Sequence, residues 1–472
     1  MNNSQMVCNN PDRRDANVGF VRRGIFGFKR KATFPHGVHP STFKEKTYQK
    51  EIRRMSFSPE MILPLSQHFG APSKPIVREG QEVVRGEPIA KADGFMSVPL
   101  HSPATGVIKK IGLMPTARGP KTESIVLKLH TGASQIIPHD MPQDVNSMTP
   151  AELVKAVQDT GMVGLGGASF PTHVKMSVPK DHKVDTVMVN GCECEPYLTT
   201  DHRVMLERSL DLFAGIRIAM KAVGAERAII GIEDNKQDAI EALRSACPIN
   251  DNSIAVGEME TKYPQGAEKM MIKALLGREV PSGGFPSATG VSVYNVATLA
   301  QLGALLPRGQ GLIERVVTIT GPGIEQPGNY LVALGTPLRF VLEHLGYHGS
   351  AKHIILGGPM MGGSIASLDV PITKGVSGVL VLTEEEEASQ VPKKVWPCIK
   401  CAECVKACPI HLNPSQLGML AAKRQYEAME SDFHLNDCFE CGCCSYVCPA
   451  GIPLVQYFRI AKMLNREAVK EI

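Results

Sequence analysis

Two cysteine runs near the C-terminus constrain this chain more than any other feature. Nine of its 13 cysteines fall between residues 398 and 448. Each run reads C-x2-C-x2-C-x3-C-P, a spacing typical of bacterial proteins that bind two [4Fe–4S] clusters, in which the fourth cysteine serves the other cluster. By this rule we assign one cluster to Cys398, Cys401, Cys404 and Cys448, and the other to Cys438, Cys441, Cys444 and Cys408.

The spacing also has a physical basis. Two intervening residues let a tight loop bring three thiolates to three corners of a cubane, and the distant cysteine closes the fourth corner. Two zinc sites or a group of disulfides are the alternatives, but neither calls for this repeated spacing with a closing Cys-Pro. Cys443 lies inside the second run, and using it would break the spacing to Cys448, so we expect it to pack without binding iron.

The composition indicates a folded protein of several domains. With 472 residues, 51 Lys and Arg against 47 Asp and Glu, and 5% aromatic residues, the chain lacks the charge and the stacking platforms of nucleic-acid binders. No apolar run is long enough to span a membrane, and the first residues lack the apolar segment of a signal peptide. We therefore expect a cytosolic chain, where clustered cysteines favour metal or redox sites over disulfides.

The residues around the cysteine runs predict a helical module. Residues 417–429 have apolar side chains close to helical spacing, and residues 453–470 also resemble a helix. A polar linker beginning at residues 384–387 precedes this module. We therefore expect a helical ferredoxin-like domain that passes single electrons through two clusters in series.

A glycine-rich segment in the middle of the chain is the second candidate site. Thr149 and Glu152 form a capping box for a helix, after which residues 164–175 read GLGGASFPTHVK. This loop is a poor dinucleotide fingerprint, because it follows a helix rather than a strand and has Ser169 at the third glycine position. It suits a cradle for a phosphate or a ring, since glycines let backbone N–H groups approach an anion and Lys175 adds a positive charge.

Alternating strand-like and helix-like segments follow this loop. A β-rich run over residues 184–189 leads into the sequence NGCECEP at 190–196. Helices expected over 203–223, 236–247 and 267–276 alternate with strands expected over 227–232 and 253–256. Such alternation predicts a parallel sheet with crossover helices. A glycine loop, a carboxylate-rich strand end and iron–sulfur ligands in one chain predict a flavin, which converts two-electron into one-electron transfer.

At these residues the chain resembles the C subunit of the Rnf electron-transport complex, and the same glycine loop recurs in the flavin subunit of respiratory complex I. The resemblance spans most of the chain from residue 34 onward, and its motifs are followed by the double cysteine run. The motifs are FPHGVHP at 34–40 with Lys44, GLGGASFPTHVK at 164–175, NGCECEPYLTTDH at 190–202 and SVYNVAT at 292–298.

The resemblance implies FMN and NADH as cofactors. It implies that Glu195 lies near the nicotinamide nucleotide and that the loop 263–268, with Glu268, faces the nicotinamide ring, so that both carboxylates hold NADH over the flavin. The alternative is that both cap local backbone N–H groups. The chain departs from the family at Leu165, where complex I has an arginine, and at Cys192. The residues that the resemblance places around FMN are Gly164, Gly166, Gly167, Phe170, Lys175, Asn190, Glu193, Cys194, Asn295 and Thr298.

The flanking segments complete a predicted multidomain α/β fold. Residues 55–135 resemble a lipoyl- or biotinyl-type barrel sandwich, but the hairpin tip at 92–97 lacks the lysine that carries a swinging cofactor. Residues 312–385 resemble the β-grasp module that follows the flavin domain in the family. We expect an N-terminal extension at 1–54, a Rossmann-like FMN and NADH domain at 140–311, and the helical ferredoxin domain at 390–472.

The resemblance implies a peripheral subunit of a membrane-bound, ion-translocating ferredoxin:NAD oxidoreductase. Such a subunit exchanges hydride between NADH and FMN and passes electrons through two clusters, at the cytoplasmic face of the bacterial inner membrane. Its implied partners are the membrane subunits, the other iron–sulfur subunit, NADH and, indirectly, ferredoxin, but no nucleic acid. The alternatives are a flavin and iron–sulfur cobalamin reductase of bacterial microcompartments, and a ferredoxin-like carrier whose central region is only a scaffold.

Overall fold

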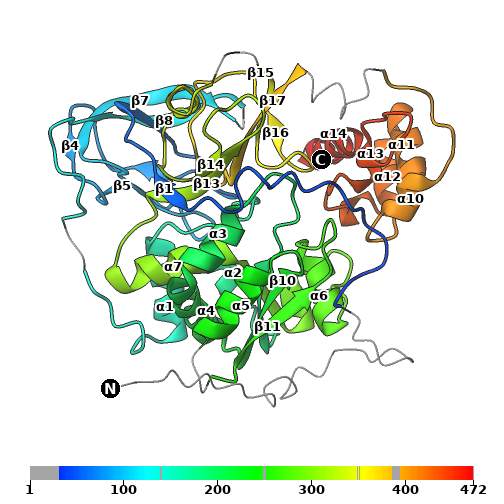
Figure 1. Ribbon diagram of the computed structural model, residues 1–472, viewed down its shortest axis with the longest axis horizontal. Coiled ribbons are helices and arrows are strands. Elements are labelled where there is room, and N and C mark those ends of the chain that lie inside the picture. Colours follow the sequence, from blue (N-terminus) through cyan, green and yellow to red (C-terminus); the bar gives the residue numbers. More distant parts are fainter. Residues whose placement is uncertain are drawn as a thin grey trace, which may run out of the picture.

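The computed structural model describes residues 31–117, 119–138, 141–247, 251–347, 349, 351–384 and 394–470. Residues 1–30 of the expected N-terminal extension and 385–387 of the expected polar linker lie outside these residues. Within the described ranges, no helix is both long and apolar enough to cross a membrane. In Figure 1 a strand-rich region lies above a helix-rich region, and a separate helical module lies beside them.

Two small antiparallel sheets form the barrel-like module between residues 60 and 129. One sheet has the order β2-β8-β7-β4 and the other the order β3-β5-β6. Their apolar residues, such as Leu63, Ile89 and Ile108, are at most 1% exposed and join the main core. The strands are β2 Glu60–Pro64, β3 Lys74–Pro75, β4 Glu82–Val83, β5 Pro88–Lys91, β6 Leu100–His101, β7 Gly106–Thr116 and β8 Gly119–Leu129.

A parallel sheet of order β11-β10-β9-β12 forms the centre of the helix-rich region, as the alternation of segments predicts. Its strands are β9 Thr186–Gly191, β10 Arg227–Glu233, β11 Ile254–Met259 and β12 Val291–Asn295. The helices around it are α1 Pro150–Asp159, α2 Thr172–Met176, α3 Thr200–Glu207, α4 Ser209–Val223, α5 Gln237–Ala246, α6 Glu268–Leu276 and α7 Val296–Leu305, with the 3₁₀ turns η2 Pro286–Thr289 and η3 Leu306–Arg308.

Of two predictions from local sequence in this region, the capping box and a single helix over 203–223, only the first is correct. The capping box is confirmed, because the Thr149 hydroxyl accepts from the backbone of Glu152 and the Glu152 carboxylate accepts from the backbone of Thr149. The single helix expected over 203–223 is wrong, since Arg208 takes a non-helical conformation (φ −129°, ψ 34°) and separates α3 from α4. The Arg208 guanidinium donates to Gln301 of α7, a long-range contact that helical periodicity does not contain.

A mixed six-stranded sheet of order β1-β14-β13-β17-β15-β16 is formed mainly by residues that follow the parallel sheet in the chain. Its edge strand β1 comes from the N-terminal part of the chain. Strands β13 and β14 of this sheet are followed in the chain by helix α8. The elements are β1 Ile52–Arg54, β13 Glu314–Thr320, β14 Gly328–Ala333, α8 Leu338–His344, β15 Ala351–Leu356, β16 Gly363–Ser364 and β17 Gly378–Thr383.

The two cysteine runs lie in a helical module with its own core. Its elements are α10 Glu403–Ala407, α11 Pro414–Ala422, α12 Tyr426–Ser431, η4 Leu435–Asp437, α13 Cys443–Tyr446 and α14 Leu454–Lys470. The continuous helix expected over 417–429 is interrupted, because Arg424 has a φ of +57° and ends α11 before α12 begins. Leu417 and Phe458, from α11 and α14, are at most 1% exposed and hold the module together.

The segment 31–54 ties these regions together. In Figure 1 this blue segment runs from β1 between the upper and lower regions towards the orange and red helices. Strand β1 pairs in parallel with β14, and Val38 and Tyr263 exchange backbone hydrogen bonds of 2.8 and 2.9 Å. The backbone N–H of Gly37 donates to the carbonyl of Ala407 in the helical module, at 3.2 Å.

Candidate functional site

The parallel sheet reverses its order at β9, and we call the region outside the carboxyl ends of β9 and β12 the crevice. The chain runs outward from β9 to β10 and β11, then crosses back to β12 on the other side of β9. Asn190 and Asn295 are register partners at the carboxyl ends of β9 and β12. Open α/β sheets bind ligands outside the strand ends at such a switch point.

The glycine loop lies directly on the end of β12. The backbone N–H of Leu165 donates to the Thr298 hydroxyl at 2.8 Å, and a Cβ added to Gly166 would lie 3.1 Å from Asn295. Gly166 and Gly167 are exposed, and a Cβ added to Gly167 would meet nothing within 4 Å. The loop therefore presents backbone to open space above the crevice, which fits a bound phosphate or ring.

A second loop approaches the same crevice from β11. The Asn190 amide donates to the carbonyl of Gly266 at 2.7 Å. A Cβ added to Gly266 would lie 2.5 Å from the carbonyl oxygen of Cys192, so only glycine permits this approach. The loop 263–268 is thereby held against the strand end that carries Cys194.

An ion pair joins the two loops. Lys175, in α2 after the glycine loop, contacts the carboxylate of Glu268 at the start of α6, and their side chains are 28% and 43% exposed. The ammonium of Lys175 also lies 5.8 Å from the centre of the Tyr294 ring. A positive and a negative group are therefore both available at the rim of the crevice.

Glu193 is engaged at the first turn of α3. It is 6% exposed, and its carboxylate accepts from the backbone N–H groups of Asp201 at 2.8 Å and His202 at 3.3 Å. Lys44, from the N-terminal segment, donates to the backbone carbonyl of Glu193 and lies 4.0 Å from its carboxylate. Glu193 thus anchors the segment that contains HGVHP to the loop that follows β9.

The carboxylate of Glu195 is held by another region of the chain. It accepts from the backbone N–H groups of Met360 at 3.0 Å and Met361 at 2.9 Å, in the loop between β15 and β16. This contact corresponds to the capping alternative for Glu195, although its donors lie far away in the sequence. Burial raises the pKa of Glu195 to about 7, against the opposing effect of the two donors.

The raised pKa gives Glu195 a predictable effect on stability. A carboxyl whose pKa rises on folding stabilises the fold fully below its unfolded pKa of 4.5, and that contribution is lost as the pH rises through about 7. We therefore expect the melting temperature of the parent to fall relative to that of Glu195→Gln between pH 5 and pH 7 (roughly the window between the two pKa values). The measurement is a thermal melt at each pH.

The matched control for this series is Glu82→Gln, which removes a carboxylate that is 83% exposed on the barrel-like module. Its melting temperature should follow that of the parent throughout. A constant difference between the parent and Glu195→Gln across the same pH range would contradict the raised pKa.

Two residues that the sequence did not single out complete the crevice. The amide of Asn295 donates to Asp201 at 2.6 Å, and burial, with the charge of Glu193, raises the pKa of Asp201 to about 7. Arg315, which is 1% exposed on β13, donates to the carbonyl of Leu165 at 3.1 Å. Asp201 lies in the motif at 190–202, but the sequence assigned it no role. Nothing in the sequence around Arg315 indicates a contact with the glycine loop.

The ring of Phe170 packs towards the barrel-like module. It stacks on Phe69 with a centroid distance of 5.9 Å and an angle of 28°. Cys192 is 6% exposed and its thiol contacts the carbonyl of Gly231 and the sulfur of Met259, as a small packing residue would.

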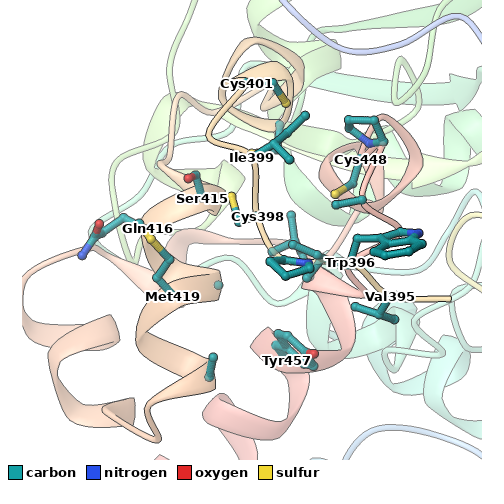
Figure 2. A pocket seen from close by; sticks show the side chains of 18 of the residues that line it. Val395, Trp396, Cys398, Ile399, Cys401, Ser415, Gln416, Met419, Cys448 and Tyr457 are labelled. Carbon is teal, nitrogen blue, oxygen red and sulfur yellow. The ribbon is translucent and has the colours of Figure 1, made fainter.

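The cysteines of one predicted cluster line the larger of two cavities in the helical module. This cavity, of about 580 Å³, is lined by Cys398, Cys401, Cys404 and Cys448, which we call the outer set. Figure 2 shows Cys398, Cys401 and Cys448 around it, together with the apolar side chains of Trp396 and Ile399. Cys398 and Cys401 are exposed. Members of both runs thus share one cavity, as the crossover rule requires.

The other cysteines line a second, narrower cavity of about 20 Å³. Its thiols are Cys408, Cys438, Cys441 and Cys444, which we call the inner set, and Cys443 lies beside them. Cys408, Cys441 and Cys444 are between 7% and 9% exposed. Among the residues that the structure describes, no three His, Cys, Asp or Glu side chains converge as ligands of one metal ion. Each set supplies four thiols, which is the donor set that a [4Fe–4S] cluster takes.

Four family models match successive stretches of the chain. They are the RnfC barrel sandwich hybrid domain over residues 32–131, the Nuo51 FMN-binding domain over 157–304, the SLBB domain over 316–363 and a 4Fe-4S dicluster domain over 397–452. The chain is therefore a multidomain α/β protein with an FMN-binding domain and a dicluster domain.

Three similar proteins cover most of this chain, and each is the C subunit of its complex. The chain is 42% identical to that of a proton-translocating ferredoxin:NAD(+) oxidoreductase complex from Clostridium ljungdahlii, over 92% of this chain and 94% of that protein. It is 42% identical to that of a Na(+)-translocating ferredoxin:NAD(+) oxidoreductase complex from Acetobacterium woodii, over 85% of this chain and 90% of that protein. It is 39% identical to that of an ion-translocating oxidoreductase complex from Haemophilus influenzae, over 91% of this chain and 64% of that protein. These similarities confirm the resemblance seen in the motifs.

Proposed function

The chain belongs to the family of C subunits of ion-translocating ferredoxin:NAD(+) oxidoreductase complexes, and from this premise we propose that it exchanges hydride between NADH and FMN and passes single electrons to two [4Fe–4S] clusters. A bound flavin supplies the conversion between two-electron and one-electron transfer. The observation that carries the proposal is that one chain contains the glycine loop, the 263–268 loop that approaches the same crevice, and the two sets of cysteines.

The FMN-binding residues that we propose surround the crevice at the ends of β9 and β12. Backbone N–H groups of the glycine loop would hold the phosphate, with Asn295 and Thr298 fixing the loop and Lys175 adding charge. The full proposed set is Gly164, Gly166, Gly167, Phe170, Lys175, Asn190, Glu193, Cys194, Asn295 and Thr298.

Glu268 is the group that we propose to contact the nicotinamide nucleotide. It begins α6, it is 43% exposed, and it lies next to the loop that approaches the crevice. A carboxylate there would bind ribose hydroxyls or the nicotinamide amide rather than the phosphates of NADH. Glu195 also faces this region in our proposal, but its carboxylate already accepts from Met360 and Met361, so we propose that it positions their loop and acts on the nucleotide through it.

The burial of the proposed ligands indicates the order in which electrons would pass through the two clusters. Cys441 of the inner set packs in a core cluster with Tyr263 of the flavin domain, whereas Cys398 and Cys401 of the outer set are exposed. We propose that electrons from the flavin reach the inner set first and leave through the outer set. Around the exit, Val395, Trp396 and Ile399 are between 53% and 68% exposed, which favours contact with a partner protein.

The finer architecture belongs to the same proposal. The two antiparallel sheets suit a lipoyl-like barrel sandwich at 55–135, the parallel sheet a Rossmann-like domain at 140–311, and the mixed sheet a β-grasp module at 312–385. A helical ferredoxin domain at 390–472 and an extension at 1–54 complete the proposed division.

We propose the partners and the location from the named relatives. The membrane subunits of the complex, its other iron–sulfur subunit and, indirectly, ferredoxin would exchange electrons with this chain at the cytoplasmic face of the bacterial inner membrane. Anaerobic addition of NADH to the purified chain tests the proposal, with cobalamin as the added acceptor that tests the alternative reductase function.

A further inference from the structure

Tyr263 joins the two redox regions of the molecule. Its side chain is 1% exposed, and its hydroxyl donates to the backbone carbonyl of Cys441, a member of the inner set, at 2.6 Å. The ring packs in a core cluster with Val38, Ala407 and Cys443. Tyr263 and Cys441 are 178 residues apart in the sequence, so this hydrogen bond directly connects the flavin domain to the helical module.

The backbone of Tyr263 is held as firmly as its side chain. Its N–H and carbonyl both pair with Val38 of the N-terminal segment, at 2.9 and 2.8 Å. Three residues further on, the carbonyl of Gly266 accepts from Asn190 at the end of β9. One short loop therefore contacts the proposed flavin crevice at one end and the peptide of a proposed cluster ligand at the other.

A hydrogen bond at this point has an electrostatic consequence for the cluster. Cluster type, net charge, hydrogen bonds to the sulfurs and solvent exposure set the reduction potential of an iron–sulfur cluster. A donor on the carbonyl of Cys441 draws electron density away from the ligand, which favours the reduced and more negative state of the cluster. The phenol remains a donor at neutral pH and is itself neither oxidised nor reduced.

We propose that Tyr263 is a positioning residue that raises the reduction potential of the inner cluster and fixes the helical module against the flavin loop. This inference rests on the proposed function, since it assumes that the inner set binds a [4Fe–4S] cluster. The hydroxyl group of Tyr263 would make the inner cluster a better electron acceptor than it would be with its cysteine ligands alone.

The direct test is Tyr263→Phe, which removes the hydroxyl and keeps the ring. An EPR-monitored redox titration should show a lower midpoint potential for the inner cluster and an unchanged potential for the outer cluster. The outer signal is identified by its loss in Cys398→Ala. Backbone amide hydrogen exchange around residues 441–446 should become roughly ten-fold faster, the loss expected for one buried hydrogen bond.

Tyr330→Phe is the matched control. Tyr330 is 4% exposed and its hydroxyl donates to the carbonyl of Gln326 at 2.8 Å, in the mixed sheet. The Tyr330 hydroxyl also accepts from Arg53 at 2.6 Å, so this variant should lose at least as much stability as Tyr263→Phe, without changing either potential. A shift that is equal for both clusters in Tyr263→Phe, or no shift at all, would overturn the proposal.

If Tyr263→Phe fails to retain iron, a fluorotyrosine placed at position 263 keeps the test decisive. Its more acidic hydroxyl is a stronger donor, so the potential of the inner cluster should rise, and an unchanged or lower potential would overturn the proposal. Failure of the proposed function has a different signature, because the parent itself would then lack iron or fail to react with NADH.

Discussion

Glu268→Gln should slow the NADH-driven reduction of the protein by about 100-fold, the scale expected when a substrate loses its position relative to the reacting group. The carboxylate lies at the rim of the crevice and pairs with Lys175, so its loss removes an acceptor for the nucleotide without disturbing the core. FMN and iron contents should match the parent, and dithionite should still reduce the clusters. Stopped-flow absorbance after mixing with NADH measures the rate.

Glu279→Gln is the control for this variant. Glu279 follows α6, is 74% exposed and pairs with Lys273, so the change removes the same charge from a comparable ion pair on the surface. Its reaction with NADH should equal that of the parent. If Glu268→Gln also reacts at the parent rate, Glu268 belongs to the scaffold.

Glu195→Gln separates the two carboxylates. Glutamine retains an acceptor oxygen for one of the N–H groups of Met360 and Met361 but removes the charge. We expect NADH-driven reduction to be lost here too, through misplacement of the 360–361 loop. Unaltered oxidation of NADH by this variant would remove Glu195 from the proposed site.

Cys408→Ser should halve the iron content, from about eight atoms per chain to about four, and should prevent NADH from reducing the cluster that remains. Cys408 lines the inner cavity with Cys438, Cys441 and Cys444, although it belongs to the first run in the sequence. Its loss would empty the inner site and leave the outer cluster cut off from the flavin. Iron analysis and EPR after addition of NADH and then dithionite measure both effects.

The same variant distinguishes crossover ligation from ligation within each run. If each run held its own cluster, Cys408→Ser would empty the outer site instead, and NADH would still reduce the remaining cluster. Cys443→Ser is the matched control, because Cys443 lines the same cavity and is fully buried. It should keep about eight iron atoms.

Local chemistry made much of this molecule predictable. The spacing of the cysteines predicted two sets of four that line two separate cavities, because a three-residue repeat constrains the loop itself. The alternation of apolar runs predicted the parallel sheet, and the strand expected over 227–232 is β10, Arg227–Glu233. The glycine loop was predicted as a cradle for a phosphate or ring, but its place on the end of β12, where a Cβ added to Gly166 would lie 3.1 Å from Asn295, was not predicted.

Contacts between modules could not be predicted in the same way. The partners of Glu195 lie 165 and 166 residues away, and Arg315 reaches Leu165 over 150 residues. No local pattern encodes such pairs, because they depend on how separate domains pack. Within one module, the interruption of a helix at Arg208 coincides with another long-range contact, since its guanidinium donates to Gln301 in another helix.

Anaerobic titration of the purified chain with NADH, followed by its visible spectrum, tests the central claim most directly. We predict that NADH alone bleaches the flavin and reduces the clusters in the same titration, with or without cobalamin. Dithionite should add little further reduction beyond that reached with excess NADH. A chain that contains flavin and iron, is reduced by dithionite, but shows no change with NADH would contradict the proposed function.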